Sequence, residues 1–368
     1  MAAQDTGNDG ARRRWRWALP TGAAVLVAGV VVGTVVATPR DDDVPTADTG
    51  GKSRQDWTSP RFVVTADSWD AEPGDGAWFQ IYDIADGGKQ REVEAVAPPS
   101  PSAGAVTSIV AGPDSTFLVA AWQVQSCETS LYRFTLTDDG HAKDLTTVTR
   151  DSIPALAAGL AISQDGRRIA YATGPCGADP ADSPPATAPI ALGVLDTATG
   201  KHRTWTSSRP TVVGEIVWAD DNRTLGYTTA EIIPASATVG TVRVHATDVE
   251  NPDTDLLSGR VLFTQADLAD TVTTAVMNAD GRTGYGALRE EDPPSTVLFT
   301  FGEGQDTHVT ETIPEDPNAA VMMSFGHDSG PRYACLGGID AFGRVDEQEL
   351  ADSSPDSGQC RAAYAAPD

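Results

Sequence analysis

The chain has 368 residues, enough for one large β domain or two ordinary ones, and its 35 glycines and 25 prolines favour many short strands over long helices. The formal net charge of -26 argues against a nucleic-acid partner, because phosphates must be neutralised by lysine and arginine. Hydrophobic residues make up 40% of the chain, which is a globular composition and excludes a wholly disordered one.

A basic stretch followed by an apolar run opens the chain. Arg12, Arg13, Arg14 and Arg16 precede residues 18–38, which are uncharged and rich in Val, Ala and Gly. At about 1.5 Å per residue this run matches a hydrocarbon core of about 30 Å. Because the arginines come before it and Asp41–Asp43 follow, we expect a single-pass anchor in the cell membrane with a cytoplasmic amino terminus. The alternative is a cleaved signal peptide, although apolar regions of signal peptides usually have only about 7–15 residues.

Composition divides the rest of the chain. Residues 1–17 form the basic cytoplasmic segment, residues 18–38 the transmembrane helix, and residues 39–56 a polar, flexible linker. Residues 57–350 are expected to form an extracytoplasmic β domain, and residues 351–368 a carboxy-terminal tail. The high acidity of the outer part suits solubility outside the cell.

One stretch defines the repeat of this domain. Leu156–Ile162 and Ile169–Ala172 read as strands joined by a tight two-residue turn at Asp165-Gly166, because Asp and Gly tolerate the positive φ that such a turn requires. Similar turns between apolar runs recur along the chain at Gly112–Ser115, Asp220–Asn222, Ala279–Gly281 and His327–Gly330. The apolar runs predict strands that are buried on both faces.

A second kind of turn recurs in phase with the first. Strands end at Asp83, Thr137, Asp196, Asp248 and Gly302, which are 54, 59, 52 and 54 residues apart. A period near fifty with four strands per unit predicts an all-β fold, a β-propeller of six four-stranded blades, with five or seven blades as alternatives. The first unit, Arg61–Val96, lacks an innermost strand, so we expect a strand from one terminus to close the ring. A two-domain β-sandwich is the competing interpretation.

The segment Ser163-Gln-Asp-Gly-Arg-Arg-Ile-Ala-Tyr171 resembles the hallmark of TolB-type and WD-like propellers of bacterial surface proteins. Residues 278–282 and 219–227 are degraded copies, and the resemblance covers about residues 60–345. The chain also looks like membrane-anchored propellers of actinomycetes. The resemblance implies a protein-binding platform with no shared catalytic residues and no cofactor.

Four cysteines follow the apolar run, where disulfides persist if this part lies outside the membrane. In a propeller, the loop between the second and third strands lies on the same face as the connection to the next blade. We therefore expect the pairs Cys127–Cys176 and Cys335–Cys360. Free thiols or a metal site are the alternatives, and the spacing lacks any Cys-x-x-Cys pair that zinc would favour.

Acidic and aromatic residues concentrate in the loops of that same face. The candidate ligand-binding residues are Trp69, Asp70, Glu72, Asp75, Trp122, Glu231, Glu290 and Glu291. Loops on a rigid scaffold usually carry function, so this rim is the predicted recognition surface. The competing interpretation is solvated charge, with the tryptophans packed between blades.

The chain contains neither Gly-x-Ser-x-Gly nor His-Glu-x-x-His, and it has no EF-hand loop. We therefore predict no catalytic residue, no metal ligand and no cofactor. The expected function is a non-catalytic binding or scaffold module for an extracytoplasmic protein, peptide or cell-wall ligand. The alternative is an enzyme that uses the central channel, either a lactonase-like metal-dependent hydrolase, with Glu231 and Glu290 as candidate calcium ligands, or a quinone oxidoreductase.

Overall fold

The computed structural model separates the chain into two units, Met1–Arg54 and Gln55–Asp368. It describes residues 61–66, 77–83, 91–123, 125–174, 191–209, 211–233, 238–250, 255–265, 271–291, 294–314, 321–325, 331–336, 340–343, 351–353 and 362–364. The predicted transmembrane helix 18–38 and linker 39–56 lie outside these residues. Across the described ranges, no helix is long and apolar enough to cross a bilayer.

The strands of the second unit pair into four-stranded antiparallel sheets. The first contains β24 (Ala362–Tyr364), β1 (Phe62–Thr65), β2 (Phe79–Asp83) and β3 (Arg91–Val96). The second contains β4 (Ala105–Ala111), β5 (Thr116–Gln123), β6 (Glu128–Leu136) and β7 (Ala142–Thr147). The third contains β8 (Leu156–Ile162), β9 (Arg168–Gly174), β10 (Ala191–Asp196) and β11 (His202–Thr206).

Three further sheets follow in chain order. The fourth contains β12 (Thr211–Trp218), β13 (Thr224–Ile233), β14 (Thr238–Asp248) and β15 (Arg260–Thr264), with the short 3₁₀ helix η1 (Leu256–Ser258) between the last two strands. The fifth contains β16 (Thr271–Met277), β17 (Thr283–Glu291), β18 (Pro294–Gly302) and β19 (His308–Pro314). The sixth contains β20 (Val321–Phe325), β21 (Pro331–Leu336), β22 (Asp340–Gly343) and β23 (Ala351–Ser353).

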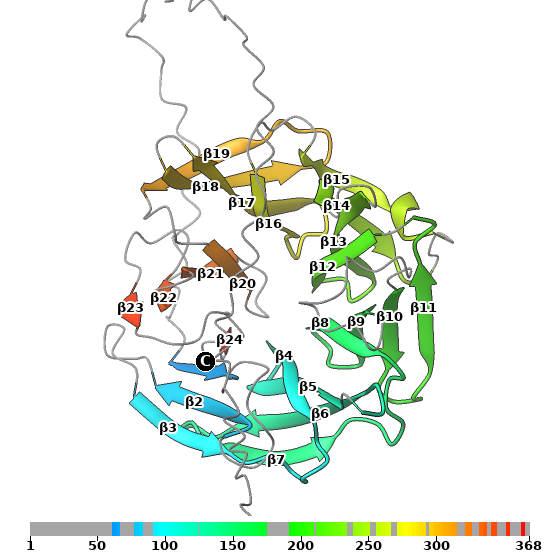
Figure 1. The fold of residues 1–368 in the computed structure, drawn as a ribbon, viewed down its shortest axis with the longest axis vertical. Coiled ribbons are helices and arrows are strands. Elements are labelled where there is room, and N and C mark those ends of the chain that lie inside the picture. Colours follow the sequence, from blue (N-terminus) through cyan, green and yellow to red (C-terminus); the bar gives the residue numbers. More distant parts are fainter. Residues whose placement is uncertain are drawn as a thin grey trace, which may run out of the picture. The chain divides into compact units, whose positions relative to one another are not determined.

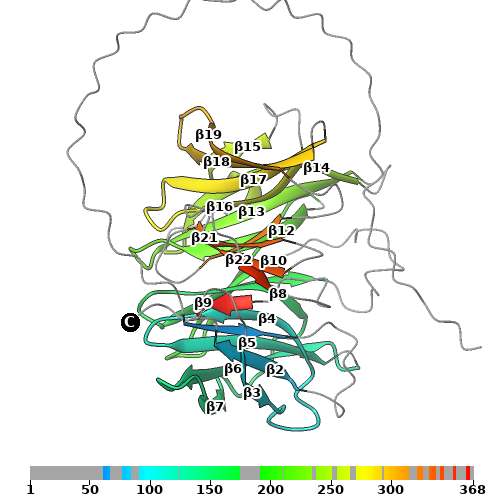
Figure 2. The same cartoon turned by 90° about the vertical axis from the view of Figure 1, so that its left-hand side faces the viewer.

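These sheets surround a common axis (Figure 1). The innermost strand is β24 in the first sheet and the earliest strand in chain order in each of the others. The innermost strands β24, β4, β8, β12, β16 and β20 each contact the next, and β20 contacts β24 again. The view turned by 90° shows the same sheets from the side (Figure 2). The fold is therefore an all-β propeller, as predicted, and the stacked sandwich is wrong.

The ring closes by a strand from the carboxy-terminal end of the chain. Strand β24 pairs with β1 through Val63↔Tyr364, Val64↔Ala363 and Thr65↔Ala362. This pairing supplies the innermost strand that the first sheet lacks, and it confirms the predicted closure. Side-chain packing is described for five of the sheets, whereas β20–β23 are described by backbone pairing alone. The structure thus shows five packed blades beside this sixth set of strands.

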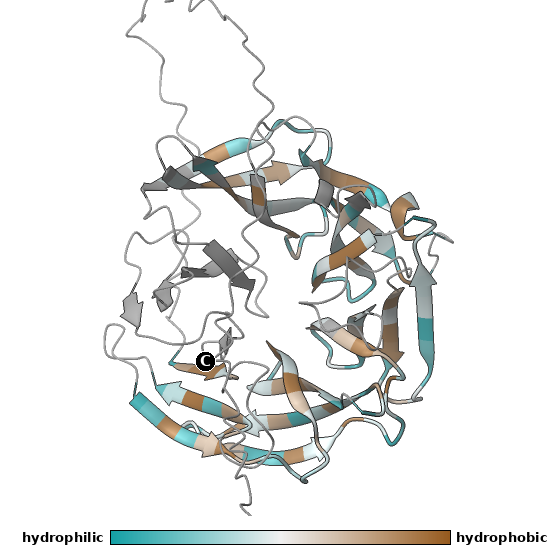
Figure 3. Cartoon of the chain, viewed as in Figure 1, coloured by the Kyte–Doolittle hydropathy of each residue, from teal (hydrophilic) through white to brown (hydrophobic). Residues whose placement is uncertain are grey.

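Aromatic rings fill the space between the first two blades. Phe134 stacks on Phe79 and on Phe117, with ring centroids 4.7 and 5.2 Å apart. Strand β5 is fully buried from Phe117 to Ala121. Burial on both faces explains the continuous apolar runs of the inner strands, seen in brown in Figure 3. Each fully buried side chain of this size stabilises the fold by about 1.5–3 kcal/mol.

The inner hairpin turns are longer than predicted. Ser163 donates its backbone N–H to the Arg168 carbonyl at 2.9 Å, so four residues, not two, form the loop. Gly166 has a φ of 67°, as the turn chemistry requires. The prediction of a two-residue turn is wrong because the Asp165 carboxylate accepts from the Arg167 N–H at 3.1 Å and thereby stabilises the wider loop.

Candidate functional site

The propeller has two faces with different polar chemistry. The turn face carries the inner hairpin turns of the repeat, at residues 163–168, 219–224 and 278–283, together with the outer turns that follow Asp196 and Asp248. The loop face carries the connections between second and third strands and those that lead into the next blade. The predicted ligand-binding residues were assigned to the loop face.

On the turn face, aspartate carboxylates accept hydrogen bonds from residues of the same hairpin turn. Asp221 accepts hydrogen bonds from the backbone N–H groups of Arg223 (2.8 Å) and Thr224 (2.7 Å), and from the Thr224 hydroxyl (2.7 Å). Asp280 is bound in the same way by Arg282 and Thr283. Desolvation alone would raise the pKa of both carboxyls, but these hydrogen bonds outweigh it and lower the pKa.

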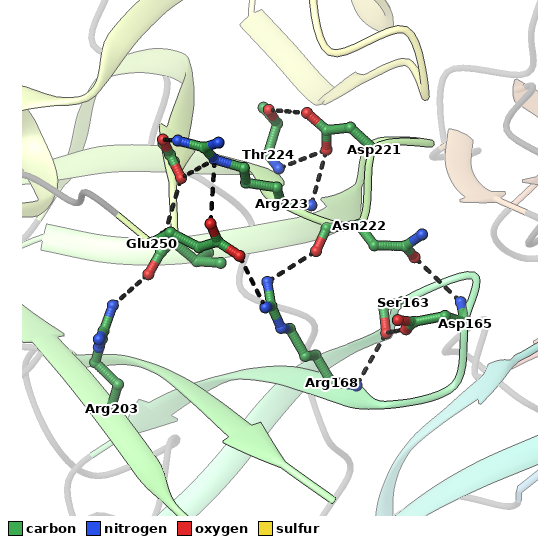
Figure 4. Close-up of polar contacts among 11 residues, drawn as sticks. Ser163, Asp165, Arg168, Arg203, Asp221, Asn222, Arg223, Thr224 and Glu250 are labelled. Atoms are coloured by element: carbon green, nitrogen blue, oxygen red, sulfur yellow. Dashed lines mark hydrogen bonds and ion pairs between the residues drawn. The ribbon is translucent and has the colours of Figure 1, made fainter.

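A polar network on this face joins neighbouring blades (Figure 4). Arg168 donates to the Asn222 carbonyl at 3.0 Å and pairs with Glu250 at 3.1 Å. The Asn222 side chain accepts from the Asp165 N–H at 3.1 Å. Arg223 in turn binds Asp248, with Nε 2.7 Å from Oδ1. Arg168 of the third sheet therefore binds the fourth sheet across the blade boundary, whereas Arg223 and Asp248 pair within the fourth sheet.

The predicted rim residues are only partly placed. Trp69, Asp70, Glu72 and Asp75 lie outside the described residues, and Glu291 is described as backbone at the end of β17. Trp122, on β5, is only 7% exposed, as the packed interpretation requires. Its small exposed area leaves little surface for a ligand.

The two remaining rim glutamates have separate partners. Glu231 Oε1 lies 3.0 Å from Arg243 Nη1 and 3.4 Å from Arg209 Nη1. Glu290 accepts from the Ser295 hydroxyl at 2.9 Å. Among the side chains that the structure describes, no group of three or more His, Cys, Asp and Glu residues is arranged to hold a metal ion. The candidate calcium pair, Glu231 and Glu290, thus lies on two different sheets with different neighbours.

Sequence reasoning missed the two arginines. Arg209 lies in the connection that enters β12, and Arg243 lies on β14 opposite Thr229. Buried hydroxyls fix the backbone at Arg209, because Ser207 and Thr211 donate to its carbonyl at 2.7 and 2.9 Å. Arg243 follows the ordinary alternation of Val242-Arg243-Val244, so no sequence signal distinguished it from a solvent-facing strand residue.

A third missed residue, Glu215, belongs to an innermost strand. The register of β12 shifts between Val213 and Ile216, so Gly214 and Glu215 form a bulge. The Glu215 side chain is solvent-accessible, yet the surrounding protein desolvates it and raises its pKa to about 7. No hydrogen bond or ion pair joins it to another described residue.

The bulge is a repeated feature of the innermost strands. Register shifts occur in β4 between Val106 and Ser108, in β8 between Ala158 and Leu160, and in β16 between Val272 and Thr274. Gly159, at the β8 bulge, has a φ of 71° that favours glycine. Small or polar residues therefore recur at this level, and the polar break in Val213-Gly-Glu-Ile216 was its sequence signal.

Cys127 is disulfide-bonded and lies in the turn before β6. Its φ of 53° is positive, which few residues other than glycine adopt. Cys176 and Cys360 lie outside the described residues, and Cys335 is described as backbone within β21. The pairs Cys127–Cys176 and Cys335–Cys360 thus stay predictions.

No protein-family model matches the chain, and no curated protein does. Among solved structures, a chain of the nidogen/laminin complex is similar, with a TM-score of 0.51 and 12% identity over 83% of this chain and 98% of that one. Oligogalacturonate lyase in complex with manganese is also similar, with a TM-score of 0.43 and 14% identity over 76% of this chain and 74% of that one. A prolyl endopeptidase is similar with a TM-score of 0.40 and 12% identity, over 68% of this chain and only 36% of the enzyme. At such identities the likeness concerns the fold alone.

Proposed function

We propose that this chain is a non-catalytic β-propeller that binds a protein, peptide or cell-wall ligand on its loop face. It is anchored in the cell membrane by residues 18–38, with residues 1–17 in the cytoplasm and residues 57–350 outside. The TolB-like and WD-like character of Ser163–Tyr171 and the closed circle of innermost strands support a bacterial-type propeller. A disulfide at Cys127 supports the extracytoplasmic location, because disulfides persist in oxidising compartments.

The exposed position of Arg209 on the loop face carries this proposal. On the turn face, Arg168 binds a carbonyl and a carboxylate across a blade boundary, and Arg223 binds Asp248 within the fourth sheet. On the loop face, Arg209 extends a side chain that is 68% exposed from a fixed backbone. Polar groups with spare hydrogen-bonding capacity on a rigid scaffold are suited to recognition.

The experiment is photo-crosslinking in intact cells with the full-length protein. A photoreactive residue replaces either Ser208, in the loop-face connection beside Arg209, or Thr199, in a turn-face loop. We expect a specific adduct from position 208 and none from position 199. Equal labelling from both positions, or no adduct from position 208, would contradict the proposal. Protease treatment of intact cells tests the topology, since residues 57–350 should be cleaved and a fully protected chain would overturn it.

An enzyme acting through the central channel is the second candidate, and Glu215 favours it. A solvent-accessible carboxyl whose pKa lies near 7 is suited to proton transfer. The test is hydrolysis of lactones and esters by the full-length protein. Activity that Glu215→Gln abolishes would establish this candidate, whereas activity unchanged in that variant would remove its basis.

A further inference from the structure

Two guanidinium groups share one carboxylate oxygen on the loop face of the fourth sheet. Arg209 and Arg243 each use a single Nη1 atom, and both contact Oε1 of Glu231. A guanidinium carries five N–H donors in a planar fork, so most donors of each arginine stay open. No other described residue binds either side chain. The cluster therefore has more donors than its own carboxylate can use.

The backbone positions of both arginines are fixed by the surrounding structure. The Ser207 and Thr211 hydroxyls, which lie 3.0 Å apart, bind the Arg209 carbonyl from either side. Arg243 lies on a central strand of the sheet, where only 30% of its side chain is exposed. Because the backbones are fixed, ligand binding has to order only the two side chains and not the loop.

The cluster brings two arginines together on a protein whose net charge is -26. Their positive charges are balanced by Glu231 and by Asp255, which interacts electrostatically with Arg209. A second arginine is not needed for stability, because an exposed ion pair contributes at most about 1 kcal/mol. A paired guanidinium fork instead matches the geometry of carboxylate and phosphate groups.

We propose that Arg209 and Arg243 form an oxyanion subsite for the carboxylate or phosphate group of a ligand bound on the loop face, with Glu231 orienting the two forks. The subsite deepens the proposed binding function and rests on it. It also changes the role of Glu231, which positions cations instead of contacting the ligand as part of an acidic rim.

The test uses the full-length protein in a non-ionic detergent at constant ionic strength. Trifluoroacetate observed by ¹⁹F NMR probes carboxylates, and inorganic phosphate observed by ³¹P NMR probes phosphates. We expect saturable line broadening of the signal of one or both probes. If both probes bind, each should displace the other. Broadening by trifluoroacetate alone assigns a carboxylate ligand, and broadening by phosphate alone assigns a phosphate ligand.

Variants locate the binding. Arg209→Gln and Arg243→Gln should each weaken it by about tenfold or more, as loss of a charge-assisted hydrogen bond predicts. Arg282→Gln removes the same charge from an exposed position on the turn face and should leave binding unchanged. Glu231→Gln keeps an acceptor oxygen but removes the competing charge, so binding should strengthen.

Two results would overturn the subsite: absence of saturable binding for both probes, or equal weakening by Arg282→Gln and the two loop-face variants. These failures are distinct from failure of the proposed function. A partner that is crosslinked at position 208 with unchanged efficiency in Arg209→Gln would remove the subsite and leave the binding function intact. Loss of every loop-face crosslink in the unmodified protein would remove the binding function itself.

Discussion

Arg168 of β9 reaches the neighbouring sheet and donates to the backbone carbonyl of Asn222, 3.0 Å away. The contact joins a strand of one blade to the inner hairpin turn of the next. Arg260 repeats it one blade further on, where its Nη2 lies 2.7 Å from the Gly281 carbonyl. The arginine-to-turn contact is thus a recurring link between blades, and it explains why charged residues cluster at the hairpin turns.

Replacing Arg168 with Ala should destabilise the propeller. The change removes the Asn222 hydrogen bond and the Glu250 ion pair, and the free energy of unfolding should fall by about 1–2 kcal/mol. The adjacent Arg167 is exposed, and its side chain has no hydrogen bond or ion pair among the described residues. Arg167→Ala is therefore the matched control. Urea unfolding measures both variants, and equal stabilities would contradict the inter-blade role.

The aspartates of the hairpin turns should make the free energy of unfolding decrease at low pH. In the folded state the pKa of Asp221 is lowered, so its contribution is present above the unfolded pKa of about 3.9 and is lost as pH falls through the folded pKa. Asp221→Asn should cost about 1 kcal/mol at pH 7 and less at pH 3. Asp306→Asn, at an exposed position, is the control. Thermal unfolding at the two pH values tests this, and a pH-independent difference would argue against it.

His245 is buried beside Tyr227, with ring centroids 5.4 Å apart. Its Nδ1 lies 3.2 Å from the Gly259 carbonyl and its Nε2 lies 3.0 Å from the Thr229 hydroxyl. The neutral ring makes both hydrogen bonds, since Nδ1–H donates to the Gly259 carbonyl and Nε2 accepts from the Thr229 hydroxyl. A second proton would leave Nε2 facing a hydroxyl that must then rotate, inside a desolvated site.

Desolvation lowers the pKa of His245, so folding favours the neutral ring. This contribution is full above the unfolded pKa of about 6.5 and declines as pH falls below it. His245→Gln should cost about 1–3 kcal/mol at pH 7.5. Its free energy of unfolding should also fall less between pH 7 and pH 5 than that of the unmodified protein. His308→Gln changes an exposed residue and should retain the full pH dependence; parallel curves for all three proteins would refute the assignment.

The sequence predicts local features of this fold well because turn chemistry is local. Asp165 and Gly166 mark a hairpin whatever surrounds them, and their periodic recurrence predicts the four-stranded units. The loop-face cluster needs tertiary information instead. Glu231 meets Arg243 only because Thr229 pairs with Arg243 and the register then shifts between Ala230 and Ile232. A bulge of this kind cannot be assigned from residue patterns, so sequence reasoning placed Glu231 in an acidic rim.

Glu215 illustrates the same limit, because alternation alone gives its side chain no defined face at a bulge. Its pKa of about 7 in the folded state exceeds the ordinary value, so the folded state binds the proton more tightly. The associated stability is full below the unfolded pKa of about 4.3 and is lost as pH rises through 7.

Glu215→Gln should therefore stabilise the protein at pH 8 and have little effect at pH 4.5. Because water reaches the side chain and screens the charge, we expect the free energy of unfolding at pH 8 to increase by only about 1 kcal/mol, which corresponds to about 2 °C in Tm. The exposed Glu303, on the outer turn of the fifth sheet, provides the contrast. Glu303→Gln removes a charge that pairs with Arg260, so it should not stabilise the protein at pH 8. Calorimetric scans at both pH values would decide, and a Glu215→Gln variant that is less stable at pH 8 would contradict the prediction.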